Sequence, residues 1–342
     1  MNALENVRRC IEFEGPDHIP VTSPVFGREP EFWYIRLETP SYTPRVPGAT
    51  EWGHTMKKTS VPNHGIPADL PIETWDMLAD FRWPDARNPE RYRSIPERLA
   101  APEAGRRYVH LGWYVGLYDT ILRLRGWQAS MTDFVAEPAK IKDLIARVTD
   151  FMLAGIDTLS EKFPGRIHGI LIPDDWGGQK AAFISIEMWE EFFGGPYREI
   201  GRHIHKAGMH FWLHSDGRIN ELLDTLIECG VDVVNMPSPT VVDIDEIAER
   251  FAGRICFANG VDIQKTLVRG TDDEIEDEAR RLVEKWNTPK GGFIPFAEYN
   301  LRAIGAAPRR ALAAVNAFRK YAWNLPPLSD EESRAFMARL EI

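Results

Sequence analysis

Cysteine is scarce in this sequence of 342 residues. The three present, Cys10, Cys229 and Cys256, lie far apart and form no Cys-x-x-Cys pair. An odd number at such spacing argues against a disulfide framework and favours a reducing compartment. The N-terminal stretch 1–15 also lacks the apolar segment of a secretory signal. We therefore expect a cytoplasmic protein.

Long apolar runs and an excess of positive charge are absent as well. No stretch approaches the roughly 18 uninterrupted apolar residues of a membrane span. The 41 basic residues against 51 acidic ones argue against nucleic acid as the main partner. A hydrophobic share of 44% excludes a disordered chain. We expect a globular protein with a small-molecule substrate and with neither a membrane nor a nucleic-acid role.

The sequence pattern changes at about residue 105. Residues 18–105 are rich in proline at irregular spacing, which predicts short strands and long loops. Over 106–325, apolar runs alternate regularly with amphipathic helical stretches such as 187–207, 220–229 and 272–286. The six runs, together with a seventh candidate at the start, are 19–22, 108–112, 167–172, 209–213, 231–235, 254–258 and 292–296.

This alternation predicts a parallel sheet. No Gly-x-Gly-x-x-Gly follows the first run, which weakens the case for a dinucleotide-binding fold. We expect an α/β protein, a (β/α)8 TIM-type barrel in one domain over 1–342, with a loop-rich N-terminal region. A barrel of this kind carries its site at the carboxyl ends of the strands. Four runs are followed there by acidic, imidazole or amide groups: Asp174, Asp175, His214, Asp216, Asn259 and Glu298.

Asp174 and Asp175 are the candidate acids. Adjacent residues on an extended segment point to opposite sides, so one of the two is equally well explained as a helix-capping group. If both face the mouth, crowding raises one pKa and supplies a general acid.

His214 and Asp216 share one face if their strand continues. They are predicted to be catalytic, as a polarising pair, or to bind a divalent metal, zinc or another, with Glu298 as third ligand. The alternative for His214 is a satisfied structural histidine.

Substrate-binding candidates come from several places along the chain. Arg28 follows the first apolar run and suits a substrate carboxylate, unless it is a surface arginine. The 11 tryptophans are unusual in number, and some of them lie beside strand ends. Together with Arg28, the residues predicted to line an aromatic-walled pocket for a flat substrate are His110, Trp113, Trp176, Gln179, Trp212, Asn259 and Tyr299.

Several of these segments resemble one known family in their order and spacing. They are Asp174–Gln179 with 184–188, Leu213–Gly217 with the helix up to 230–232, Asn259–Asp262, and Gly270-Thr271 with 291–294; Arg125-Gly126-Trp127 adds to them. In these residues the chain resembles the uroporphyrinogen decarboxylase (URO-D) superfamily, which includes corrinoid-linked methyltransferases. The resemblance implies an enzyme with a (β/α)8 barrel and makes a homodimer plausible.

The sequence departs from the family at functional positions. The methyltransferases hold zinc with one His and two Cys, but here Asp216 stands at the first Cys position and Tyr299 near the second. A zinc-thiolate site is therefore not expected, although a nitrogen and oxygen site for a harder metal is. In the decarboxylases an early sequence motif binds the propionate groups of the substrate. Only Gly27-Arg28 matches that motif here, which argues against uroporphyrinogen itself as the substrate.

Three functions follow as hypotheses. The first is a carboxy-lyase for a cyclic or aromatic carboxylated small molecule, with Asp174 or Asp175 as acid and with no cofactor indicated beyond the divalent metal named above. The second is a corrinoid (cobalamin)-dependent methyltransferase or demethylase component, with a corrinoid protein as partner. The third is a non-catalytic binding protein.

Overall fold

The computed structural model describes residues 1–340 except 59–64, 114 and 298–299. No helix within these ranges is long and apolar enough to cross a lipid bilayer. The described residues form a main sheet of seven strands, all parallel, in the order β1-β4-β5-β6-β7-β8-β9. These strands are β1 (Phe32–Arg36), β4 (Tyr108–Gly112), β5 (Gly169–Pro173), β6 (His210–His214), β7 (Val233–Asn235), β8 (Cys256–Asn259) and β9 (Phe293–Pro295).

The sheet curls as a TIM barrel does, and it has an open seam between its edge strands β1 and β9. The predicted strand at 19–22 is wrong, because this segment forms no ladder. It bridges the seam instead: the Thr22 hydroxyl donates to the Pro295 carbonyl oxygen of β9 at 2.7 Å, and the Val21 carbonyl accepts from the Glu31 N–H at 2.8 Å. Pro20 has no N–H for a ladder, which explains the difference.

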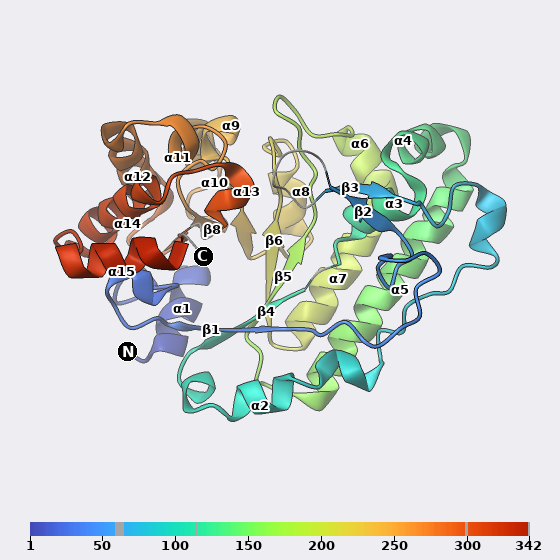
Figure 1. Cartoon of the computed structure of the whole chain (residues 1–342), viewed down its shortest axis with the longest axis horizontal. Helices are drawn as coiled ribbons and strands as arrows, with labels where there is room; N and C mark the ends of the chain where they lie inside the picture. Colours follow the sequence, from blue (N-terminus) through green and yellow to red (C-terminus); the bar gives the residue numbers. More distant parts are fainter. Residues whose placement is uncertain (59–64, 114, 298–299, 341–342) are drawn as a thin grey trace.

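Helices cover the outside of the sheet: α5 (Pro138–Lys162) and α7 (Gly195–Lys206) flank β4–β6, whereas α12 (Asp272–Trp286) and α14 (Pro308–Trp323) lie on the far side of β8 (Figure 1). They are α1 (Ala3–Ile11), α2 (Ile95–Ala100), α3 (Leu117–Arg125), α4 (Trp127–Ala136), α5 (Pro138–Lys162), α6 (Ile186–Trp189), α7 (Gly195–Lys206), α8 (Leu223–Glu228), α9 (Pro239–Val242), α10 (Ile244–Phe251), α11 (Thr266–Arg269), α12 (Asp272–Trp286), α13 (Leu301–Ile304), α14 (Pro308–Trp323) and α15 (Asp330–Leu340). Single 3₁₀ turns occur at Pro24–Phe26, Trp75–Leu78, Pro89–Tyr92 and Pro102–Gly105.

Two of the predicted helices differ in detail from the structure. The helix expected over 187–207 is interrupted by a π-helical turn at Glu190–Gly194, between α6 and α7. The helix expected over 220–229 is the shorter α8. The third, α12, has the predicted bounds, and Thr271 and Glu274 form the expected reciprocal capping box at its start.

The proline-rich region is loop-rich as expected, and its own short elements include the antiparallel pair β2 (Thr55–Lys57) and β3 (Ile66–Ala68). It also supplies β1, a strand of the main sheet that the sequence pattern did not predict. Phe32 and Ile35 of β1 are buried, on opposite faces of the strand. The region is therefore part of the sheet as well as a cover for it.

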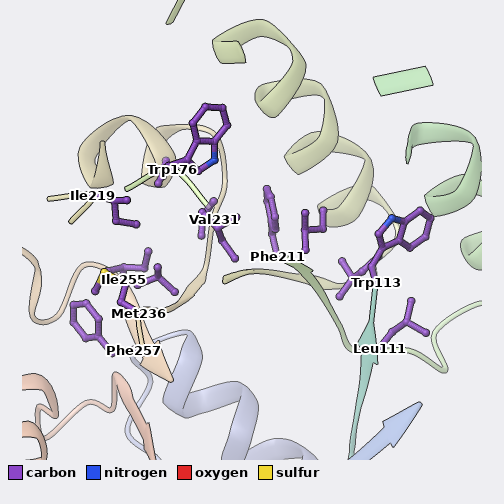
Figure 2. Packing of buried hydrophobic residues seen from close by; sticks show 14 of the residues in the cluster. Leu111, Trp113, Trp176, Phe211, Ile219, Val231, Met236, Ile255 and Phe257 are labelled. Atoms are coloured by element: carbon purple, nitrogen blue, oxygen red, sulfur yellow. The ribbon is translucent and has the colours of Figure 1, made fainter. Parts of the chain in front are cut away.

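Two apolar clusters hold the sheet in place. The larger lies between the sheet and the helices, and Figure 2 shows Leu111, Phe211 and Phe257 of three strands within it. The smaller lies inside the curl and includes Val7 and Cys10 of α1 together with Trp212 of β6. The first helix therefore closes the floor of the barrel, at the amino-terminal ends of the strands.

Candidate functional site

A cavity of about 750 Å³ lies at the carboxyl ends of the strands, where a barrel-like fold positions its site. Its polar wall comes from α3 and from the ends of β5, β6 and β7, and consists of Asp119, Arg123, Asp175, His214, Asp216 and Asn235. Its apolar wall includes Phe26, Leu267, Phe296, Ala311, Val315 and Phe318. One side of the cavity can therefore hold a charged or metal-bound group while the other packs against an apolar one.

Asp174 and Asp175 point in opposite directions at the end of β5. Asp174 is fully buried, and its carboxylate accepts the N–H groups of Leu117, Tyr118 and Asp119 at the start of α3 and the Tyr197 hydroxyl. Burial raises the pKa of Asp174 to about 7, although the hydrogen bond from Tyr197 opposes the rise. Asp174 is thus placed as a helix-capping group outside the cavity, whereas Asp175 lines it.

Asp175, His214 and Asp216 form the centre of the polar wall. Each offers one ligand atom, and these three atoms lie within 4.8 Å of one another. Asp175 Oδ1 also accepts the Asp216 N–H at 2.9 Å, which fixes the loop after β6 against the end of β5. Glu298, the expected third ligand, lies outside the described residues, and Asp175 completes the set of three instead.

The His214 ring is oriented by Asn235 at the end of the neighbouring strand. The Asn235 amide nitrogen donates to the Ala258 carbonyl, so its oxygen is the acceptor for His214 Nδ1 at 2.6 Å. This hydrogen-bond network assigns the proton of a neutral imidazole to Nδ1. The Nε2 lone pair then faces Asp175, whose Oδ1 is 3.9 Å away. Metal-binding histidines are held in this way by the partner of their other nitrogen.

The carboxylates of the cavity are short of positive partners. Asp216 Oδ1 is buried with no hydrogen-bond partner among the described residues. Burial raises the pKa of Asp216. The nearby charge of Asp175 raises this pKa further, whereas His214 lowers it. Three carboxylates, of Asp119, Asp175 and Asp216, face the single guanidinium of Arg123 on this wall. An orphaned carboxylate oxygen in an acidic cavity fits a bound cation.

Asp119 and Arg123 are site residues that the sequence analysis missed. They lie one turn apart on α3 and form an ion pair at 2.6 Å. Burial raises the pKa of Asp119, against the lowering by Arg123. Arg123 Nε is buried without a partner in the described part of the chain. In the sequence this spacing is that of an ordinary surface ion pair, and only its place after the 108–112 run could have singled it out.

Two of the tryptophans predicted to line the pocket belong to the core. Trp176 is fully buried, stacks on Tyr118 at 4.2 Å and donates to the Tyr197 hydroxyl. Trp113 is buried against Gly155 of α5. The predicted pocket role of both is wrong, because their segments turn the rings outward, toward the helices.

Other predicted substrate contacts also lie elsewhere. Arg28 lines a separate surface groove with Glu103 and Arg106. Gln179 is exposed and donates to Gln264 at 2.9 Å. Asn259 is fully buried and bonds to the backbone N–H and carbonyl of Met236, which links β7 to β8. Tyr299 lies outside the described residues.

His110 and Trp212 line a second cavity of about 600 Å³, here called the inner cavity, within the curl of the sheet. Asn235 and Phe296 line both cavities. The two spaces are therefore neighbours, and a substrate-binding role of His110 and Trp212 stays a prediction.

Comparison with known proteins decides the family. Residues 99–298 match the sequence model described as Uroporphyrinogen decarboxylase (URO-D). The chain belongs to the URO-D family. The matched segment is more than half of the chain and contains Asp119, Arg123, Asp175, His214 and Asp216. The resemblance drawn from the sequence motifs is thereby confirmed at the level of the family.

Solved structures agree with the URO-D fold. A methyltransferase from Methanosarcina mazei is similar over 100% of this chain and 98% of its own, with a TM-score of 0.60 at 14% sequence identity. At that identity the likeness shows the fold alone. A GH5-4 broad specificity endoglucanase from Clostrdium longisporum is similar over 79% of this chain and 94% of its own at 10% identity. Its TM-score of 0.34 is too low to indicate a shared fold. No curated protein matches the chain.

Proposed function

We propose that this URO-D family chain is the substrate-binding component of a metal-dependent methyl transfer, in which a methyl group leaves an oxygen atom of a small molecule. The observation that carries the proposal is the group of Asp175, His214 and Asp216, which gathers one nitrogen and two oxygen ligands at the mouth of the sheet. The fold likeness to a methyltransferase supports the same direction.

The ligand set suits a divalent cation that prefers oxygen and imidazole to thiolate. Bound there, such a cation would stabilise the negative charge that develops on the leaving oxygen when the carbon–oxygen bond breaks. Asn235 keeps His214 Nε2 free and aimed at the site through the bond to Nδ1. Asp175 accepts the Asp216 N–H, which keeps the two carboxylates together despite their charge.

The acceptor of the methyl group is proposed to be a corrinoid protein, because the family resemblance includes corrinoid-linked methyltransferases. The apolar wall of the cavity offers packing for the rest of the small molecule. Arg123, which lines the cavity beside Asp119, is proposed to contact an oxygen of that molecule.

Metal analysis tests the proposal directly. We expect the purified protein, after dialysis against Zn²⁺, Mn²⁺ or Co²⁺, to retain about one ion per chain. His214→Ala should lose it, and Asn235→Leu should weaken the affinity by about tenfold to a hundredfold, because His214 loses its orienting partner. His203→Ala, on the outer helix α7, is the control and should bind as the wild type does. A wild-type protein that retains none of these metals would overturn the proposal.

Carboxy-lyase chemistry has one observation in its favour. Asp119 is a carboxyl group with a raised pKa beside the guanidinium of Arg123 within the cavity. Such a pair could hold a substrate carboxylate and supply the proton that replaces the lost carbon dioxide. Release of carbon dioxide by a metal-free preparation, abolished in Asp119→Asn and unchanged in His214→Ala, would support this function over methyl transfer.

A further inference from the structure

Two arginines line the rim of the inner cavity. This cavity of about 600 Å³ is open to solvent, and Arg36 and Arg98 contribute to it from exposed positions. Its deeper wall is apolar and includes Leu171, Trp212 and Phe296. A space of this size, with an apolar wall and a few charged groups, suits a small molecule that carries a negative charge at one end.

Arg36 is the last residue of β1 and lies on the inner face of the curled sheet. On the same strand Phe32 belongs to the inner apolar cluster, and its ring stacks on that of Tyr34 at 5.8 Å. Because side chains alternate along a strand, Arg36 lies on the same face as both of them. The guanidinium of Arg36 has no hydrogen-bond or ion-pair partner among the described residues. Its N–H groups are therefore available to a ligand.

Arg98 is held at the same rim by its contacts with β1. Its guanidinium lies 4.3 Å from the centroid of the Trp33 ring, and its Nη2 donates to the Tyr34 carbonyl oxygen at 3.0 Å. These contacts orient the guanidinium against an edge strand of the sheet and leave other N–H groups of its fork for a ligand. Such orientation lowers the entropy cost of binding.

The charges of the rim match a single negative charge. Glu38 is the acidic residue among those that line the inner cavity, so the two guanidiniums leave an excess of one positive charge. Burial lowers the pKa of His110 to about 3, so this neighbour adds no charge at physiological pH. A carboxylate fits in both charge and geometry, because its two oxygens accept the paired N–H groups of an arginine. A phosphate monoester, with up to two negative charges, matches the rim less well.

The rim and the polar wall lie at the same edge of the sheet. Arg36 ends β1 and His214 ends β6, and the carboxyl ends of parallel strands meet at one edge. The two strands are three steps apart in the sheet, which is about 14 Å along its curved surface. Asn235 and Phe296 line both cavities. A one-ring molecule held at the rim can therefore extend its far end toward His214.

We propose that Arg36 and Arg98 bind a carboxylate group of the substrate, and that this contact directs the opposite end of the molecule toward Asp175, His214 and Asp216. The substrate class is then a one-ring carboxylate with a methoxy group at the far end. The inference rests on the proposed function for that far end only. The two arginines act as specificity-determining residues through the charge that they recognise.

Two matched probes test the recognition of charge. Isothermal titration calorimetry compares 4-methoxybenzoate with 4-methoxybenzamide, which has a similar shape and no charge, on the full chain freed of metal by a chelator and dialysis. The wild type should bind the benzoate about threefold to tenfold more tightly, the effect of a hydrogen-bonded ion pair at an exposed site. Arg36→Gln and Arg98→Gln should each bring this ratio closer to one. Arg36→Lys should keep part of it, because lysine retains the charge but not the fork.

Arg28→Gln is the matched control, because Arg28 was predicted to bind a carboxylate but lines a different groove. It should leave the ratio as in the wild type. Arg36→Gln should also melt as the wild type does, since Arg36 has no partner to lose among the described residues. This variant is therefore decisive even if Arg98→Gln, which loses its contact with Trp33, is less stable. A wild type that binds neither probe, a wild-type ratio near one, a ratio unchanged in Arg36→Gln, or a ratio lost in Arg28→Gln would overturn the proposal.

The outcome is independent of the metal. A protein that discriminates the two probes through Arg36 but retains no divalent ion would leave the carboxylate site standing and remove the proposed methyl transfer. A protein that binds metal but shows no Arg36-dependent ratio would do the reverse.

Discussion

At the scale of single residues, the neighbours Asp174 and Asp175 carry identical side chains that lie in different environments. Asp174 is enclosed and accepts three backbone N–H groups of α3, whereas Asp175 faces the cavity beside His214. The alternation of an extended chain predicts that two such neighbours diverge. Asp174 is the one that is buried because the N–H groups at the start of α3 bind its carboxylate. The start of α3 is close to the end of β5 only in the folded protein, so the sequence alone does not show which of the two is buried.

The buried carboxyl of Asp174 has a consequence for pH dependence. Its folded pKa of about 7 lies above the value near 3.9 expected in the unfolded chain. Between these values the folded state keeps the proton and the unfolded state releases it, so this group lowers stability as the pH rises from about 4 to 7. We expect the free energy of unfolding of the wild type, relative to Asp174→Asn, to fall by up to ~4 kcal/mol over that range.

Urea unfolding of both proteins at several pH values measures this difference. Other groups titrate alike in the two proteins, so subtraction isolates Asp174. Parallel profiles from pH 4 to 8 would show that its carboxyl group is not perturbed in the folded state.

The chemistry of the polar wall could be read in part from the sequence. His214 and Asp216 were expected together because they follow one apolar run at a spacing of two. Asp119 and Arg123 could not be placed, because a surface ion pair and a cavity-facing pair share the same spacing. The position of Arg28 depends on the path of the proline-rich loop, which the local sequence pattern does not determine. In the structure Arg28 lies in a separate surface groove.

At the scale of elements, the packing of α5 on the sheet depends on one glycine. A Cβ at Gly155 of α5 would overlap the six-membered ring of Trp113, which follows β4. An alanine usually stabilises a helix interior by about 0.5–1 kcal/mol relative to glycine. Here the missing side chain is what lets the helix and the ring approach.

Gly155→Ala should therefore destabilise the protein by about 1–3 kcal/mol, the cost of overpacking a filled core. Gly105, at the end of the 3₁₀ turn Pro102–Gly105, is the control position, since a Cβ there meets nothing within 4 Å. Gly105→Ala should leave stability unchanged or raise it slightly. Thermal or urea unfolding compares the two variants, and an equal effect of both would contradict the role given to Gly155.

The strands of the regular half were the most predictable elements. Their apolar runs are bounded by polar residues, and six of the observed strands overlap the predicted runs. The strand β1 escaped prediction because it lies among prolines and because its aromatic side chains hide the alternation. The 19–22 segment was predicted as a strand for its apolar residues, but Pro20 prevents a ladder.

At the scale of the whole molecule, the first helix completes the inner core. Val7 and Cys10 are fully buried, and the Gly292 N–H donates to the Cys10 carbonyl at 2.9 Å. Fully burying one aliphatic side chain stabilises a protein by about 1.5–3 kcal/mol. The buried side chains of α1 therefore contribute several kcal/mol to the free energy of unfolding.

Deletion of residues 1–11 should expose this inner core. We expect a melting temperature lowered by more than about 10 °C, since two or three buried side chains are lost from a protein of this size, together with new binding of the dye ANS. Arg8→Ala, which changes an exposed residue of the same helix, is the control and should melt close to the wild type. A deleted protein that melts as the wild type does and binds no ANS would contradict this role of α1.

The bridge across the seam also sets an order of events during synthesis. Thr22 meets Pro295 across 273 positions of the chain, and Cys10 meets Phe293 across 283. Contacts of such sequence separation form late, because the loop between them must close first. Cys10 and Thr22 are synthesised well before β9, so a nascent chain that ends before β9 carries an unsealed barrel floor that chaperones can recognise.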